Sequence, residues 1–241
     1  MAAKFASLRT KPTLKLAFKG LLFSLLVLFV YDYPGSVLAA FIFLVAAFIL
    51  YARPRFNSLK FSASFIALAL APFILPPLPF SNIITAIILG AVFVILVGVK
   101  NLILLRREKW YFVAHILLLT MYGAAILYAG PSFVIAGAAF VLFFLLFREF
   151  YSRMSTLQGP RLALSSALES LIATELIAIL YVLPIGFIAS SIIFTLILSV
   201  LSDIFIHHLN GHLSRRLILR NSTILIFAIL LVSAFSGWSL I

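Results

Sequence analysis

Long apolar runs separated by short polar stretches occupy most of this chain. A helix that spans a bilayer needs about 20 mainly apolar residues, each of which adds about 1.5 Å of length. The third and sixth of these runs are short or bounded by proline, so they are candidates for tilted, broken or partly re-entrant helices. Cutting the runs at charges, prolines and glycines predicts about nine membrane segments, at residues 14–31, 36–52, 61–78, 82–104, 110–129, 131–147, 162–183, 186–206 and 219–239.

The composition supports the same interpretation. Hydrophobic residues make up 65% of the 241 positions, whereas soluble domains have roughly 45–50%. The stretches between the segments are too short to hold a soluble domain. We therefore predict an all-α, polytopic helical membrane protein in which residues 1–241 form a single membrane domain.

The basic residues gather at alternate ends of the segments. Lysine and arginine occur before the first segment and after the second, fourth, sixth and eighth, while the other loops and the C-terminal tail have none. Because cytoplasmic loops are enriched in lysine and arginine, this pattern predicts a cytoplasmic N-terminus, an outside C-terminus and an odd number of spans. The net charge of +12 then indicates attraction to anionic lipid headgroups and not to nucleic acid. We expect an integral protein of a prokaryotic plasma membrane.

Two stretches of the chain are similar to two later ones. Residues 28–56 match 125–153, and residues 74–88 match 179–193. Four segments per unit is an even number, so two such units have the same orientation in the membrane. The pattern predicts repeat halves at 14–105 and 110–206 with an extra helix at 219–239. The alternative is chance similarity, because a few apolar residue types dominate the sequence.

Three acidic residues lie within or at the edge of the late apolar segments. They are Glu169 and Glu175 in the seventh segment and Asp203 in the eighth. An ionised carboxylate near the middle of a spanning helix costs at least about 2.5 kcal/mol, so such groups usually face the bundle interior and have a partner. Glu175 is the deepest of the three. The functional interpretation is a proton-binding or cation-binding carboxyl; the structural one is a neutral acid hydrogen-bonded to a neighbouring helix.

Polar residues recur at every fourth position along the eighth segment. Four-residue spacing keeps them on one face of a helix, where they would line a hydrated path or a binding groove. The alternative is that small hydroxyl side chains allow close helix packing. The series is Ser191, Thr195, Ser199, Asp203 and His207.

Lys100 in the first half occupies nearly the place that Asp203 has in the second. A Lys100 to Asp203 pair or a Lys19 to Glu169 pair would bind the two halves together. Alternatively, long lysine side chains near helix ends extend to the membrane interface and need no partner.

Three of the four histidines lie near the end of the eighth segment. Asp203 with His207, and His208 with His212, are pairs spaced by four residues, and a carboxylate with imidazoles suits zinc or another divalent ion. The metal-site hypothesis therefore names His207, His208 and Asp203. The alternative is that these histidines complement a helix C-terminus and the headgroup layer. The chain has no cysteine, which excludes thiolate ligands and disulfides.

These features favour a small-solute or ion transporter, or a channel-like protein, with an acidic site in the inner leaflet. The predicted path contains Glu175, Glu169, Asp203, Ser199, Thr195 and Lys100. The alternatives are a non-catalytic membrane subunit or scaffold of a larger complex, and an enzyme that acts on lipid at the cytoplasmic face through Asp203, His207 and His208. Motifs for hydrolases, P-loops and dinucleotide binding are lacking, so we expect no enzyme and no cofactor apart from the possible divalent metal. Expected partners are membrane lipids and either other membrane proteins or a second copy of the chain.

Overall fold

A computed structural model describes residues 12–53, 61–75, 82–101, 103, 107–130, 132–155, 158–211 and 213–235. The described part consists of helices and turns, without strands, so the predicted all-helical fold is confirmed there. Each helix overlaps one predicted apolar segment. In chain order they are α2 (Pro12–Asp32), α3 (Val37–Ala52), α4 (Ser62–Ile74), α5 (Asn82–Lys100), α6 (Arg107–Ala129), α7 (Phe133–Met154), α8 (Pro160–Val182), α9 (Phe187–Leu209) and α10 (Arg215–Phe235).

Several of these helices are long and apolar enough to cross a membrane. Among the described residues, 6 helices meet that description, namely α2, α5, α6, α7, α8 and α9. The shorter apolar helices α3 and α4 have 16 and 13 residues, which at about 1.5 Å per residue gives about 24 Å and about 20 Å. Such a set of helices indicates a membrane protein. The number of spans and their orientation stay predictions.

Two predicted segments end at different places in the structure. The third was expected to run to residue 78, but α4 ends at Ile74. Proline disfavours helical geometry in the residue before it, and Pro76 follows closely. The sixth was expected to end at residue 147, but α7 continues to Met154, with Phe150 and Tyr151 buried in this extension. Burial of aromatic surface therefore continues this helix past the charged residue at which the apolar pattern stops.

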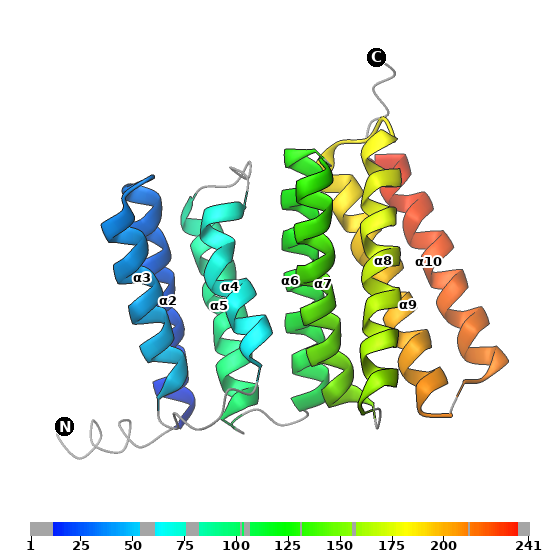
Figure 1. The fold of residues 1–241 in the computed structure, drawn as a ribbon, viewed down its shortest axis with the longest axis horizontal. Coiled ribbons are helices and arrows are strands. Elements are labelled where there is room, and N and C mark those ends of the chain that lie inside the picture. Colours follow the sequence, from blue (N-terminus) through cyan, green and yellow to red (C-terminus); the bar gives the residue numbers. More distant parts are fainter. Residues whose placement is uncertain are drawn as a thin grey trace. The chain divides into compact units, whose positions relative to one another are not determined.

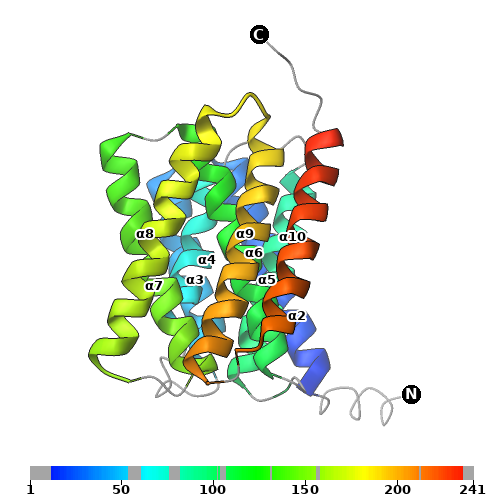
Figure 2. The same ribbon diagram turned by 90° about the vertical axis from the view of Figure 1, so that its right-hand side faces the viewer.

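The chain divides into two compact units, residues 1–114 and residues 115–241, and the division falls within α6. In the first unit, α2 packs against both α5 and α3, and Figure 1 shows α2 beside α3. In the second, neighbouring helices pack in chain order, α7 on α8, α8 on α9 and α9 on α10 (Figure 2). The internal repeat stays a prediction.

A serine caps the start of both α3 and α7. Ser36 accepts a hydrogen bond from the Ala39 amide, and Ser132 accepts one from the Ile135 amide, so each serine caps the start of its helix. These caps satisfy amide groups that have no partner within the helix. The local resemblance fits the sequence similarity of these two stretches.

Glycines allow α2 and α5 to approach closely in the first unit. A Cβ atom placed on Gly90 would overlap the Ser24 hydroxyl, and one placed on Gly20 would overlap the Val94 side chain. Small residues let helix backbones come together in membranes. Beside this crossing, the rings of Phe23 and Phe93 stack with centroids 4.4 Å apart.

Candidate functional site

A buried carboxyl group lies at the centre of the polar contacts of the second unit. Glu169 on α8 is 0% exposed. The Ser202 hydroxyl of α9 donates a hydrogen bond to Glu169 Oε1 at 2.6 Å, and the Tyr151 hydroxyl of α7 donates one to Oε2. Both donors are also fully buried. The acid therefore joins three neighbouring helices; we call Tyr151, Glu169 and Ser202 the carboxyl triad.

Local sequence places the three members of the triad. Pro160 begins α8 in the first-turn position that proline tolerates, and Glu169 follows on the face that also buries Ser166 and Ser170. The hydroxyls of those serines donate to carbonyl oxygens of their own helix, which leaves Glu169 as the polar group that reaches other helices. In the described part of the chain, no lysine or arginine forms an ion pair with it. Because a buried carboxylate without a cation is costly, its hydroxyl partners matter to the fold.

A second polar cluster lies one residue further along α9. Asn221 of α10 donates from Nδ2 to Asp203 Oδ2 at 2.6 Å. His207 Nδ1 lies 3.4 Å from Asp203 Oδ1, and the two side chains are 36% and 34% exposed. Asp203 therefore links α9 to α10 where its side chain is partly exposed, whereas the side chain of Glu169 is fully buried.

Asn221→Leu is expected to lower the free energy of unfolding by about 1 kcal/mol, because Asp203 loses a donor but stays partly exposed. Thermal unfolding of the purified protein in detergent measures this. Thr223→Val is the matched control, since Thr223 is an exposed residue of the same helix whose hydroxyl bonds only Leu219 O within it. Equal effects of the two substitutions would show that the contact between α9 and α10 contributes nothing.

Two of the three candidate metal ligands lie close together in the structure, but the third does not join them. Asp203 and His207 do come together, while His208 is exposed. Searching the described ranges finds no group of three histidine, cysteine or acidic residues placed to hold a metal ion. His212 lies outside the described residues. A divalent metal at Asp203, His207 and His208 stays a prediction.

The hydroxyl series along α9 bonds mainly to its own helix. Ser191 donates to Ile188 O at 2.7 Å, and Ser199 donates to Leu196 O at 2.9 Å. Thr195 lies within hydrogen-bond distance both of Ser191 O and of the Thr120 hydroxyl on α6, at 3.0 Å from the latter. These contacts favour the helix-packing interpretation of the series. The residue that reaches the buried acid is Ser202, next to the series and not in it.

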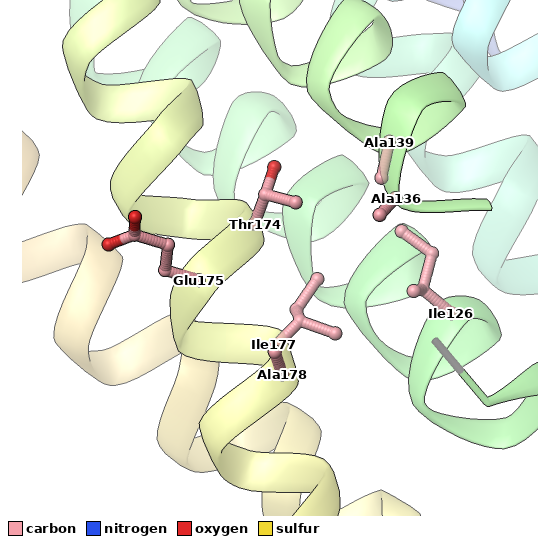
Figure 3. Close-up of a pocket in the computed structure, with 7 residues that line it drawn as sticks. All are labelled: Ile126, Ala136, Ala139, Thr174, Glu175, Ile177 and Ala178. Carbon is pink, nitrogen blue, oxygen red and sulfur yellow. The ribbon is translucent and has the colours of Figure 1, made fainter. Parts of the chain in front are cut away.

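Glu175 does not join Glu169. It is exposed on α8 and is one of the residues that line a pocket of about 170 Å³ formed by α6, α7 and α8. Figure 3 shows its carboxylate pointing away from Ile126 and Ala139 on the other side of that pocket. The two acids are six residues apart, which at 3.6 residues per turn places them about 120° apart around the helix. One core-facing stripe therefore cannot hold both, and the structure buries Glu169.

Lys100 and Lys19 have partners within the first unit. Lys100 Nζ donates to Tyr51 O at 2.8 Å, and Lys19 Nζ donates to Leu50 O at 2.7 Å and to Arg53 O at 2.8 Å. The proposed partners Asp203 and Glu169 likewise have contacts in their own unit. The structure thus provides local partners for all four groups of the two predicted ion pairs.

Sequence reasoning missed Tyr151 and Ser202. Tyr151 follows two charged residues beyond the predicted end of its segment, and Ser202 differs in register by one from the regular polar series. The helical extension of α7 and the rotation of α9 about its axis decide that these hydroxyls face Glu169. Neither is visible in the spacing of polar residues.

Comparisons of the chain with protein-family models, with curated proteins and with solved structures find no match. The class that can be stated is therefore a helical protein with several apolar helices capable of crossing a membrane.

Proposed function

We propose that this protein moves a small solute or an ion across a membrane, and that Glu169 binds a proton or a cation during transport. The observation that carries the proposal is a fully buried carboxyl on a helix long enough to span a membrane, held by hydroxyls of two other helices. Ionisable residues within such helices are rare and usually functional. The membrane in question is, on this proposal, a prokaryotic plasma membrane with the triad toward its cytoplasmic side.

The carboxyl triad offers a physical means of coupling. An ionised carboxylate only accepts hydrogen bonds, whereas a protonated one also donates. Gain of a proton at Glu169 therefore changes what Tyr151 and Ser202 can donate to it, and these residues belong to α7 and α9. Proton or cation binding would in this way shift the preferred packing of three helices, which is what alternation between two states requires.

Asp203 and His207 provide an entry point for the proton in this proposal. Their side chains are partly exposed, and Asp203 is the chain neighbour of Ser202. Protons or cations would pass from the accessible cluster to the buried acid over one turn of α9. Thr195, Ser199 and Lys100 have no direct part in this step.

The second candidate is a membrane subunit of a larger complex. The observation that favours it is the exposed Glu175 on an otherwise apolar face of α8, where Leu168 and Leu171 are each 47% exposed. An acid at that depth usually has a protein partner. A lipid-acting enzyme that uses Asp203, His207 and His208 stays a prediction. Asp203 and His207 are in contact, but His208 is exposed and no described contact joins it to them.

The test is flux in liposomes that contain a pH-sensitive dye, with a potassium gradient and valinomycin to drive protons, and with parallel measurements of sodium and potassium. Glu169→Gln keeps the shape and two hydrogen-bonding atoms but cannot ionise, so we expect flux to fall at least about tenfold, as for loss of a group that takes part directly in proton transfer. Glu108→Gln, an exposed acid in the first turn of α6, is the matched control.

Unchanged flux in Glu169→Gln would contradict the proposed role of the triad. Wild-type flux equal to that of empty liposomes for all three ions would contradict ion transport itself. Loss of flux in both variants would show that the effect is not specific to the buried acid.

A further inference from the structure

Three cationic residues meet at the C-terminal end of α3, in the first unit. Lys19 comes from α2, Arg53 directly follows α3, and Lys100 is the last residue of α5. Both ammonium groups bond carbonyl oxygens of the α3 end at 2.7–2.8 Å, and Lys100 Nζ also lies 3.7 Å from the centre of the Tyr51 ring. Because Lys19 bonds the carbonyls of Leu50 and Arg53 and Lys100 bonds that of Tyr51, the three like charges lie near one another. We call Lys19, Arg53 and Lys100 the basic cluster.

The cluster holds more positive charge than its protein partners balance. Its bonding partners are neutral carbonyls at a helix end, whose dipole amounts to roughly half a negative charge. Among the described residues of the first unit, no acid forms an ion pair with any of its members. Asp32 lies at the far end of α2, about 20 Å from Lys19 at about 1.5 Å per residue. A bound anion would balance the positive charge of the cluster.

Within the described part of the chain, the cluster also keeps donors for a ligand. An ammonium has three N–H groups, of which Lys19 uses two on carbonyls. The Arg53 residue is exposed and Lys19 is partly exposed, whereas Lys100 is 8% exposed. A ligand would thus contact Arg53 and Lys19, while Lys100 raises the positive potential behind them.

The surface of α3 that leads to Arg53 is apolar. Ile42, Val45 and Ile49 are 42%, 42% and 41% exposed and, at spacings of three and four, lie on one face of the helix, with Arg53 four residues after Ile49. Acyl chains suit this face, and the phosphate of a lipid headgroup suits a neighbouring arginine and lysine. A ligand with an anionic phosphate beside hydrocarbon fits both surfaces.

We infer that the basic cluster is a binding site for a phosphate group, brought by an anionic phospholipid. The geometry of Lys19, Arg53 and Lys100 around the α3 end, next to the exposed apolar face of α3, defines the site. The site belongs to the first unit and does not depend on the transport role of Glu169. Free phosphate has the same chemistry at its charged end, and the experiment separates the two sources.

The test titrates the detergent-purified protein with phosphatidylglycerol, with phosphatidylcholine and with inorganic phosphate, and follows the melting temperature and lipid retention in native mass spectrometry. The double variant Lys19→Gln with Arg53→Gln removes two charges, while the side-chain amide introduced on α2 keeps N–H donors for the α3 carbonyls. If each cation that contacts the phosphate contributes about a factor of 5 to the affinity, the apparent affinity for phosphatidylglycerol should fall about 25-fold. Lys15→Gln, an exposed lysine one turn earlier in α2, should keep wild-type affinity.

Each outcome decides the matter. Preference for phosphatidylglycerol over phosphatidylcholine in the wild type and in Lys15→Gln, lost in the double variant, supports the lipid site. A similar dependence on inorganic phosphate alone supports a phosphate site served from solution and overturns the lipid source. Wild-type preference in the double variant, or no response of the wild type to either phosphate source, overturns the site itself. Arg53→Gln alone, a change at an exposed residue, repeats the comparison if the double variant does not fold.

Discussion

Glu169→Leu is expected to lower the free energy of unfolding by about 2–6 kcal/mol. Leucine removes the acceptor for two buried hydroxyls, those of Tyr151 and Ser202. A buried polar group left without a partner costs about 1–3 kcal/mol, and the two costs arise together. Unfolding of the purified protein in detergent by heat or by a denaturing detergent measures the change.

The combined variant Tyr151→Phe, Glu169→Leu and Ser202→Ala gives this prediction its control. Removing all the partners of a buried hydrogen-bond group with apolar side chains of similar shape is often nearly neutral. We therefore expect the triple variant to recover most of the stability that Glu169→Leu loses, while it stays inactive in the flux assay. Additive losses from the three substitutions would contradict the triad as one hydrogen-bonded unit.

Gly90→Leu is expected to have the other large effect, a loss of about 3 kcal/mol or more, or failure to fold. A side chain at this position meets the Ser24 hydroxyl and the backbone carbonyl of Gly20 on the facing helix. Overpacking a close contact costs about 1–3 kcal/mol, and more when backbone must move. The amount of folded, monodisperse protein and its melting temperature are the measurements.

Gly137→Leu is the matched control, because nothing lies within 4 Å of a Cβ atom placed on that residue of α7. It should fold like the wild type. A milder pair refines the comparison: Gly90→Ala should destabilise, and adding Ser24→Gly should recover part of the loss by removing the overlapping hydroxyl. Equal tolerance of leucine at Gly90 and Gly137 would show that α2 and α5 do not cross closely there.

The helices themselves were largely predictable. Backbone N–H and C=O groups in a membrane must form their hydrogen bonds within the protein. Long apolar runs therefore form helices, in which these bonds lie within one segment. Their ends were less predictable where aromatic burial outweighs the apolar pattern, as in the extension of α7 through Phe150 and Tyr151. The ends also differed where the prediction ran through prolines, as after Ile74.

The sequence indicated which acidic residues belong to the candidate site, but not which residues bind to them. The cost of an ionised group in lipid directed attention to Glu169 and Asp203, because a membrane segment rarely carries an acid without use. It also directed attention to Glu175, the deepest acid, which the structure places on the exposed side of α8. Depth along a helix follows from residue number, but the direction in which a side chain points depends on rotation about the helix axis and therefore on which face packs.

The sequence by itself determined that this chain is helical and apolar, which residues carry charge, and at which ends of the segments they lie. These properties depend on composition and on spacing along one helix. The tertiary structure decided that Glu169 meets Tyr151 and Ser202, that Asn221 meets Asp203, and that Lys19 and Lys100 converge on the end of α3. These contacts join residues of different helices, and their formation depends on side-chain packing that no single-helix periodicity contains.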